Sequence, residues 1–432
     1  MPRAAGAAGG RRLVIAAAAS VWFSAAGLGQ TPLTLEEALR IAHQANARLP
    51  LPSFEVSSAR ERLAIAVADK WLRIAVEGDF LYAPASGYDP VLTNLGEARL
   101  QVVARQPIFA GGALKAGVER ADADLAAASA RYRIAEKDLD LEVRSRFAEW
   151  LAARAETDVR REGIERLSTY RTSLKSRQAA GQGVAADVLK TEVRIAFEEA
   201  ALADAEQRLD EARLVLNQQM GRHPGEPLEL AVLGPPQAPP TTDESAWQNA
   251  PEIVAAEAET RSAEAGLTIA QAERLPHLSL NADLGFWVSD TQHLTADFWD
   301  RFWAAKGYSL SLMLAWPVWD RGALKARVAE ADFGLRQARS RLEAERQDAR
   351  AAWLRSQAAL RNLFRQIEIL SRAVPAARDS YLEIESRYRG GTANSLEVLD
   401  AYAASVDAAV RLNEVTARYR IAEAVARRWS EP

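Results

Sequence analysis

Four short segments of the chain alternate apolar and polar residues with a period of two. In the clearest one, residues 277–288, leucine, alanine, phenylalanine and valine alternate with histidine, serine, asparagine and aspartate. This pattern predicts β-strands that have one apolar face and one polar face. The predicted strands lie at about residues 72–83, 98–109, 277–288 and 307–318.

Two much longer segments lack this alternation and predict helices. Residues 113–178 contain no proline and are rich in alanine, leucine, glutamate and arginine, which are strong helix formers. At 1.5 Å per residue this helix is roughly 100 Å long, which is too long for burial inside one compact domain. A second long helix is predicted at 323–389, where Pro375 is expected to bend or locally break it.

Shorter helices are expected around the long ones. The first is expected to run to about Leu49, because Pro50 and Pro52 break it, and the next to run over about residues 53–70. Two more are expected to follow the long helices, after glycine turns, at about 185–220 and 394–429.

The two halves of the chain repeat one another. The segment at 107–115 recurs 210 residues later, and the same offset relates the glycine turns at 181–189 and 391–399 without a gap. So long a unit differs from a short-period solenoid and predicts two similar modules side by side. The expected division is a signal peptide at 1–26, a first structural repeat at 27–220, a proline-rich linker at 221–245 and a second structural repeat at 246–432.

The N-terminus has the composition of a secretory signal. Three arginines precede an apolar run at 13–23, small residues follow it, and cleavage is expected after Ala26. A retained N-terminal anchor is the alternative. Beyond this segment no apolar run reaches the roughly 18 residues that a transmembrane helix needs.

Composition excludes several kinds of site. The chain has no cysteine, so it forms no disulfide, and its formal net charge of −4 argues against a nucleic-acid partner. The four histidines are scattered without metal-ligand spacing, so we expect no metal and no other cofactor. The sequence has neither a nucleophile elbow nor a phosphate-binding glycine loop, so we do not expect an enzyme.

The polar face of the strands has two interpretations. In a soluble sandwich it meets bulk water, whereas in a membrane barrel it lines a wet lumen. The strands alone favour the sandwich. The signal peptide and the aromatic cluster at 287–319 favour the barrel, because aromatic rings prefer the membrane–water interface. Packing of those rings inside a soluble domain is the alternative.

In the barrel interpretation, one set of leucines faces lipid and two loops lie outside the cell. The loops are at about 83–97 and 289–306. The side chains expected to face lipid are Leu278, Leu280, Leu284, Leu310, Leu312 and Leu314.

Acidic residues follow both glycine turns. Asp187 lies after the first turn, and Glu397 and Asp400 lie one helical turn apart after the second. Acids at a helix start are ordinarily explained by the helix dipole alone. In a symmetric oligomer, such positions would instead form rings of negative charge, which select cations and can gate a pore.

Together these motifs resemble the TolC family of outer-membrane efflux and secretion channels. The resemblance covers nearly the whole mature chain, and its marks are LTLEEAL at 33–39, QPIFAGG at 106–112 and WPVWDRG at 316–322, with the two glycine turns. Two positions depart from the family pattern. Ala393 stands where many members have an arginine that ties the tip closed, and Ala186 stands where threonine is common.

The resemblance implies a mainly α-helical fold with a small β part. Three subunits would each give four transmembrane strands to a twelve-stranded β-barrel, and helices to a tunnel in the periplasm of a Gram-negative bacterium. The implied function is the outer-membrane exit duct of a tripartite efflux pump or a type I secretion system, which conducts substrates passively. The implied partners are a periplasmic adaptor and an inner-membrane pump or ABC transporter.

The resemblance also assigns roles at the tip. The residues implied in adaptor docking are Gly181, Gly183, Val184, Gly391 and Thr392, and those implied in the periplasmic aperture are Asp187, Tyr388, Glu397 and Asp400. The exported substrate is not indicated.

Two other classes of protein remain as alternatives. A secreted coiled-coil scaffold or adhesin would have the helices without a pore, but the alternating strands argue against it. A periplasmic adaptor also has helical hairpins, but it needs a β-rich C-terminal half, and this chain ends in a predicted helix.

Overall fold

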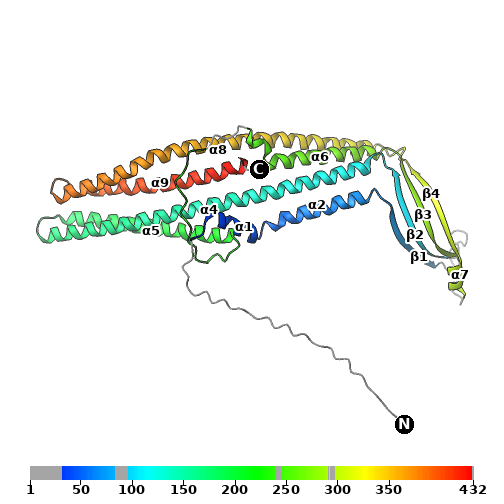
Figure 1. Ribbon diagram of the computed structural model, residues 1–432, viewed down its shortest axis with the longest axis horizontal. Helices are drawn as coiled ribbons and strands as arrows, with labels where there is room; N and C mark the ends of the chain where they lie inside the picture. The colour runs from blue at the N-terminus through cyan, green and yellow to red at the C-terminus, as the bar shows by residue number, and fades with distance from the viewer. Residues whose placement is uncertain (1–31, 83–95, 240–244, 290, 292–296, 431–432) are drawn as a thin grey trace, which may run out of the picture.

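Long helices form one body of the protein, and a four-stranded sheet stands at one end of it (Figure 1). The computed structural model describes residues 32–82, 96–239, 245–289, 291 and 297–430. The predicted signal peptide, and the loop residues 83–95, lie outside the described residues. The predicted fold class, mainly helical with a small antiparallel sheet, is confirmed.

Two helices of equal length span the molecule. They are α4 (Ala113–Ala179) and α8 (Ala323–Arg389), each of 67 residues. Gly112 precedes α4 with a φ of 92° and Gly322 precedes α8 with a φ of 89°. Only glycine adopts this left-handed conformation without strain, which explains why both copies of the motif keep it.

Both long helices end in the same kind of turn. Gly181 and Gly391 have φ values of 75° and 77°, and the following residue of each turn donates its N–H to a carbonyl five residues earlier. This is the Schellman arrangement, which satisfies the last carbonyls of a helix. The chain then returns as α5 (Ala185–Gln219) and α9 (Ser395–Ser430).

The proline pair near the N-terminus begins a helix instead of ending one. α1 (Leu35–Ala45) ends before Leu49, and α2 (Pro50–Ala68) starts at Pro50, so the predicted boundaries were wrong. A proline lacks the N–H that would go unpaired in the first helical turn and has a suitable fixed φ, so it fits there.

The helix α8 also continues through Pro375, so of the expected bend or local break, the break was wrong. Ile367 and Tyr381 lie on either side of the proline, and both are buried in apolar clusters shared with α9. Packing on both sides therefore holds the helix across the one backbone hydrogen bond that proline removes.

The helices form two rows that share α4 and α8. Near the sheet the order is α2, α4, α6 (Pro251–Ala272) and α8, and near the tip it is α5, α4, α9 and α8. A short 3₁₀ helix, η1 (Ala246–Asn249), precedes α6. Figure 1 shows that α2 and α6 fill the half nearer the sheet, whereas α5 and α9 fill the half nearer the tip. Each row has two outer helices, of which one is always α8.

The linker between the repeats lies across α4 and α9. Leu33 forms a parallel bridge with Leu230, and the Tyr419 hydroxyl donates to the Gln237 carbonyl at 2.6 Å. Arg420 donates to the carbonyl of Gly234. The segment is thus attached to both halves of the chain. No helix in the described part of the chain is both long enough and apolar enough to cross a lipid bilayer.

The sheet is antiparallel with the strands in sequence order. Its strands are β1 (Arg73–Tyr82), β2 (Gly96–Phe109), β3 (His277–Ser289) and β4 (Lys306–Ala315). The last strand ends at Ala315 and not near residue 318, since Pro317 has no N–H to donate to a neighbouring strand. The predicted loop before β4 contains a short helix, α7 (Phe298–Ala304), which the sequence analysis missed.

The pairing register gathers the apolar residues on one face. Val76 pairs with Val102, which pairs with Leu284, and paired residues point to the same side of a sheet. The opposite face carries charges, among them the ion pair between Arg105 and Glu77 at 2.9 Å. The period-two prediction of one apolar and one polar face therefore extends across all four strands.

The core of the tip half surrounds Tyr402. This α9 side chain is 1% exposed and packs with Leu167 and Tyr170 of α4 and Tyr381 of α8. Its hydroxyl lies against Gly163 of α4 and has no hydrogen-bond partner among the described residues. A glycine inside this helix therefore makes room for the tyrosine ring.

We expect Gly163→Ala to destabilise the protein, because the new methyl group would overlap the Tyr402 hydroxyl. Overpacking costs about 1–3 kcal/mol, which exceeds the gain of up to about 1 kcal/mol in helix propensity. The measurement is the midpoint of thermal loss of helical circular dichroism.

Gly117→Ala, on the same helix, is the matched control, because a methyl group there meets no atom within 4 Å. It should leave the midpoint unchanged or raise it. Tyr402→Phe removes the overlapping hydroxyl and should rescue Gly163→Ala. Equal midpoints for Gly163→Ala and Gly117→Ala would show that the tyrosine does not require the glycine.

Candidate functional site at the helical tip

The two hairpin turns lie at the same end of the molecule and are tied by one arginine (Figure 1). Arg177, in the last turn of α4, donates to the carbonyls of Tyr388 at 3.2 Å and of Arg389 at 2.8 Å. Its guanidinium also lies 5.1 Å from the centre of the Tyr388 ring. These carbonyls end α8, where the helix dipole favours a positive charge.

Tyrosine rings continue this contact into the tip core. Tyr170 meets Tyr388 edge to face, with ring centres 5.4 Å apart, and Tyr381 meets Tyr402 in the same way at 6.0 Å. Burial raises the pKa of the Tyr170 and Tyr402 hydroxyls above the usual value, so both stay neutral at physiological pH. The two hairpins therefore meet at the tip through neutral aromatic side chains.

Tyr388 is among the residues predicted from the sequence, whereas Arg177 and Tyr170 are not. Arg177 has an equivalent in the second repeat, Arg387, which instead approaches the carbonyl of Thr392 in its own turn at 3.5 Å. The repeat offset could have drawn attention to this pair. It could not have shown which of the two arginines crosses between the hairpins.

The predicted acids Glu397 and Asp400 lie on the exposed side of α9, opposite the buried Val398 and Tyr402. Glu397 also caps its helix: its N–H donates to Asn394 Oδ1 at 3.0 Å, and Asn394 Nδ2 donates to Glu397 Oε1 at 2.6 Å. Asp400 has no ion-pair partner among the described residues. Glu397 thus has a structural role of its own, whereas Asp400 is open to solvent.

The acid of the first turn, Asp187, is less exposed than Glu397 and Asp400. Asp187 lies half-buried in the first turn of α5, where its N–H donates to the Val184 carbonyl at 3.1 Å. Val184 itself is exposed. Gly183 is closely packed against the backbone of Gln178, which leaves no room for a side chain. In the second turn the Thr392 hydroxyl donates to the carbonyl of Arg387 at 3.2 Å.

The structure brings the tip residues together but places the leucines at the other end. Leu278 pairs with Leu314 and Leu280 with Leu312, on the face that also carries Leu284 and Leu310. All six share the apolar face of the sheet, as predicted from their alternation. The site residues predicted from the sequence therefore lie in two regions, at opposite ends of the long helices.

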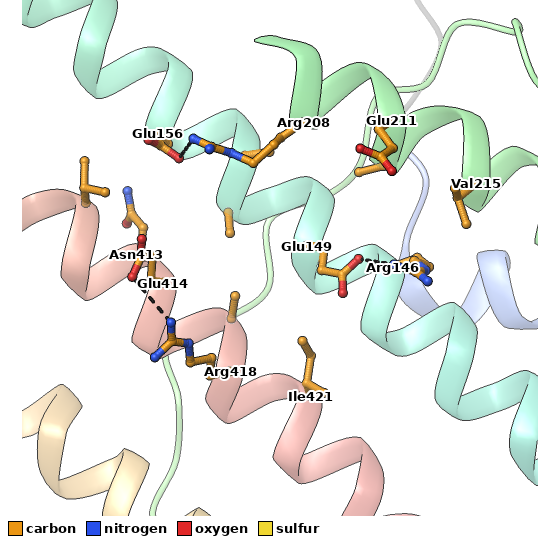
Figure 2. Close-up of a pocket in the computed structure, with 15 residues that line it drawn as sticks. Arg146, Glu149, Glu156, Arg208, Glu211, Val215, Asn413, Glu414, Arg418 and Ile421 are labelled. Atoms are coloured by element: carbon orange, nitrogen blue, oxygen red, sulfur yellow. Dashed lines mark hydrogen bonds and ion pairs between the residues drawn. The ribbon is translucent and has the colours of Figure 1, made fainter. Parts of the chain in front are cut away.

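Between these ends, a groove of about 450 Å³ lies over α4, between α5 and α9 (Figure 2). Four of its charged side chains form ion pairs within the subunit: Arg146 with Glu149 at 2.8 Å, and Arg208 with Glu156 at 2.6 Å. Glu414 lines it from α9, fourteen positions after Asp400. Among the described residues, no group of three or more histidine, aspartate or glutamate side chains is arranged to hold a metal ion.

A model of the outer membrane efflux protein family matches residues 38–222 and 244–427, which is most of the chain. The chain belongs to the outer membrane efflux protein family. The resemblance noted from the sequence motifs is thereby confirmed, and the predicted localisation in the outer membrane agrees with the family's description.

Among individual members, the chain is 27% identical over 282 residues to the pyoverdine export outer membrane protein OpmQ of Pseudomonas aeruginosa. It is 26% identical over 270 residues to the OpmQ protein of Pseudomonas putida. These matches cover 62% and 59% of the chain. The chain spans 57% and 55% of these relatives.

Solved structures of channels share the fold. The outer membrane protein VceC of Vibrio cholerae superimposes with a TM-score of 0.81 at 18% identity, covering 92% of this chain and 96% of that one. The CmeC outer membrane channel of Campylobacter jejuni gives 0.81 at 14% identity, covering 92% and 85%. The arrangement of helices and strands is therefore that of the family.

In this family member, we expect Arg177→Met to loosen the tip. The substitution removes two charge-assisted hydrogen bonds, but water reaches the freed carbonyls, so the local loss is only about 1 kcal/mol, or about fivefold in opening. Hydrogen exchange of peptides spanning 386–394 should accelerate by that factor.

Lys190→Met is the control for this prediction. Lys190 is an exposed cation near the same tip, with no ion-pair partner among the residues that the structure describes. Its removal should leave exchange at 386–394 unchanged. Equal exchange rates in wild type and Arg177→Met would show that the two hairpins are held together without this contact.

Proposed function

We propose that the protein is the outer-membrane exit duct of a tripartite efflux pump or type I secretion system, and that it conducts substrates passively and is not an enzyme. The observation that carries this proposal is the sheet: one face is apolar across all four strands, the other is charged, and both outer strands have an open edge. A water-filled pore in lipid needs this division of faces.

The open edges support a closed ring of subunits. β1 follows α2 directly and β4 leads into α8, so the outer strands and the outer helices lie on the same two lateral sides of the subunit (Figure 1). One rotation would therefore join β4 to the next β1, and α8 to the next α2 and α5. Such head-to-tail contacts close into rings. Four strands cannot close alone, and three copies give the twelve implied by the family resemblance.

We call the boundary between neighbouring subunits of this ring the seam. The outer faces of α5 and α8 match along it. Near the tip, Val193 of α5 and Leu382 of α8 are both exposed apolar side chains. Further along, Asp204 and Arg372 lie roughly 28 Å and 26 Å from the tip ends of their helices at 1.5 Å per residue. Neither Asp204 nor Arg372 has an ion-pair partner within the described part of the subunit. Opposite charges at one level favour this register.

We expect Asp204→Cys combined with Arg372→Cys to form a disulfide between subunits. The chain has no other cysteine, so any covalent product comes from this pair. Under oxidising conditions, denaturing gels should show dimer and trimer bands that reductant removes, and nothing larger than a trimer.

The mismatched pair of Asp204→Cys with Arg341→Cys is the control, because these positions lie roughly 45 Å apart along the seam at 1.5 Å per residue. It should give no covalent oligomer. A native mass of one subunit in detergent, with no product from the matched pair, would refute the ring.

The acids at the tip complete the proposed duct. Three copies of Glu397 and Asp400, with Asp187 nearby and Tyr388 behind them, would ring the periplasmic aperture. Glu397 and Asp400 are exposed in the subunit and lie on one side of α9, which supports a common surface. Rings of carboxylates attract cations and select them over anions.

Replacing both Glu397 with Gln and Asp400 with Asn should therefore lower cation selectivity and weaken block by trivalent cations. The measurement is the reversal potential and single-channel current in planar bilayers under a salt gradient. The direction follows from the loss of six negative charges per trimer.

Asn394→Ala separates this role from helix capping. It removes the partner of Glu397 at the helix start and leaves both acids in place. Selectivity should stay at the wild-type value. If Asn394→Ala reproduces the acid variants, or if the acid variants conduct like wild type, the acids are helix-start residues only.

The remaining partners follow from the tip and from the relatives. The turns at 181–184 and 391–392 are exposed at the far end from the sheet, where a periplasmic adaptor would dock and connect to an inner-membrane pump or ABC transporter. Val184 and Leu396 are exposed apolar side chains beside these turns. The names of the OpmQ relatives refer to pyoverdine export; we extend to this chain the export role, and not that cargo.

A coiled-coil scaffold without a pore is the weaker proposal. It explains the helices but leaves the apolar sheet face, with Leu310, Leu312 and Leu314 all exposed, in contact with water. An apolar patch of this kind on a soluble protein promotes association.

A further inference from the structure

The short helix α7 covers one end of the apolar sheet face. Phe298 and Phe302 insert between the helix and the sheet, where they pack with Ala98, Phe286 and Val288. The two rings are only 1% and 5% exposed. Because the strand residues of this cluster belong to the apolar rows, α7 lies on the outer, apolar side of the sheet and not on its charged side.

The helix presents two tryptophans away from this contact. Trp299 and Trp303 are 60% and 53% exposed, one helical turn apart. Their rings are held by edge-to-face contacts: the ring centre of Trp299 lies 6.0 Å from that of Phe302, and the ring centre of Trp303 lies 5.1 Å from that of Phe286. The indoles are therefore fixed in place while their surfaces remain uncovered within the subunit.

Positive charge accompanies these rings. Lys306 pairs with Phe286, so it belongs to the apolar face at its α7 end, and it is exposed without an ion-pair partner among the described residues. Arg301 also lies exposed on α7, 3.5 Å from Asp297. A lysine on an otherwise apolar strand face marks the level at which the hydrocarbon layer gives way to phosphate groups.

The spacing along β4 agrees with this level. Tyr308 follows Lys306 on the same face, apolar residues continue to Leu314, and exposed Trp316 follows the strand. The strand from Lys306 to Leu314 covers about 26 Å, and the apolar band of a membrane barrel is about 25 Å tall. The sheet therefore has an aromatic border at each end, and α7 belongs to the border farther from the long helices (Figure 1).

We propose that α7 is an interfacial anchor that binds the phosphate-bearing lipid headgroup layer of the outer leaflet through Trp299, Trp303 and the adjacent cations. The proposal rests on the proposed outer-membrane function, because it requires the apolar sheet face to meet lipid. Phe298 and Phe302 attach the helix to the sheet, and the indoles occupy the boundary between acyl chains and headgroups. The anchor fixes how far the strands extend across the membrane.

Spin labels on single cysteines test this proposal in the assembled protein. The cysteine-free chain allows single labels at Trp299→Cys, Trp303→Cys and Asp300→Cys, in vesicles of phosphatidylethanolamine and phosphatidylglycerol. Collisions with lipid-soluble oxygen and with a water-soluble nickel complex report the depth of each label. Labels at 299 and 303 should collide more often with oxygen than with the nickel complex and should lie at a shallow depth in the membrane. The label at 300, on the polar side of α7, should collide more often with the nickel complex.

Labels at Leu312→Cys and Asn281→Cys separate the possible failures. Position 312 should lie deep in lipid and position 281 should be aqueous. If 312 lies in lipid but 299 and 303 respond to nickel as 300 does, the anchor is refuted and the proposed duct is not. If 299 and 303 are shielded from both reagents, protein covers them and the anchor is refuted. An aqueous 312 refutes the duct and the anchor together.

Discussion

The unpaired backbone of the two outer strands is the constraint on which the rest of the structure depends. Along their outer edges, β1 and β4 each present N–H and C=O groups with no partner among the residues that the structure describes, and each such group costs several kcal/mol in lipid. In the proposed ring, another copy of the chain satisfies them along their whole length. The helices α2 and α5 continue the β1 side and α8 continues the β4 side, so the seam that the strands require extends along the whole proposed tunnel.

The tip half buries charged side chains beside its aromatic core. Glu198 of α5 is 3% exposed and lies between Arg160 at 3.1 Å and Arg194 at 2.8 Å. Removing one partner from such a group leaves a buried charge and costs about 3–5 kcal/mol, whereas the intact pair adds little net stability. The arrangement therefore specifies how α5 lies against α4. Arg194 also stacks over Tyr402, which extends this alignment to α9.

Sequence periodicity predicted what repeats and missed what depends on a single contact. The strands and the long helices follow from alternation and from helix formers sustained over many residues, and glycines such as Gly112 are explained by backbone conformation alone. At Pro50 the same residue fits a helix start or a helix end, and only tertiary packing decides. The helix α7 was missed because its pair of buried phenylalanines, four residues apart, occurs in a segment too short to show a period. Arg177 resembles many other helix arginines until its carbonyl partners are known.

The tie made by Arg177 also bears on the two departures from the family pattern. Ala393 and Ala186 lack side chains that could link the hairpins, yet α4 and α8 remain connected, because the acceptors of Arg177 are backbone carbonyls that every residue provides. A tie of this kind tolerates substitution at its acceptor positions. It is also weak enough to be reversible, since hydrogen bonds from a charged donor contribute about 1.5–3 kcal/mol when buried and less where water can replace them. In the proposed duct, adaptor binding of ordinary affinity would be sufficient to break this contact between the hairpins.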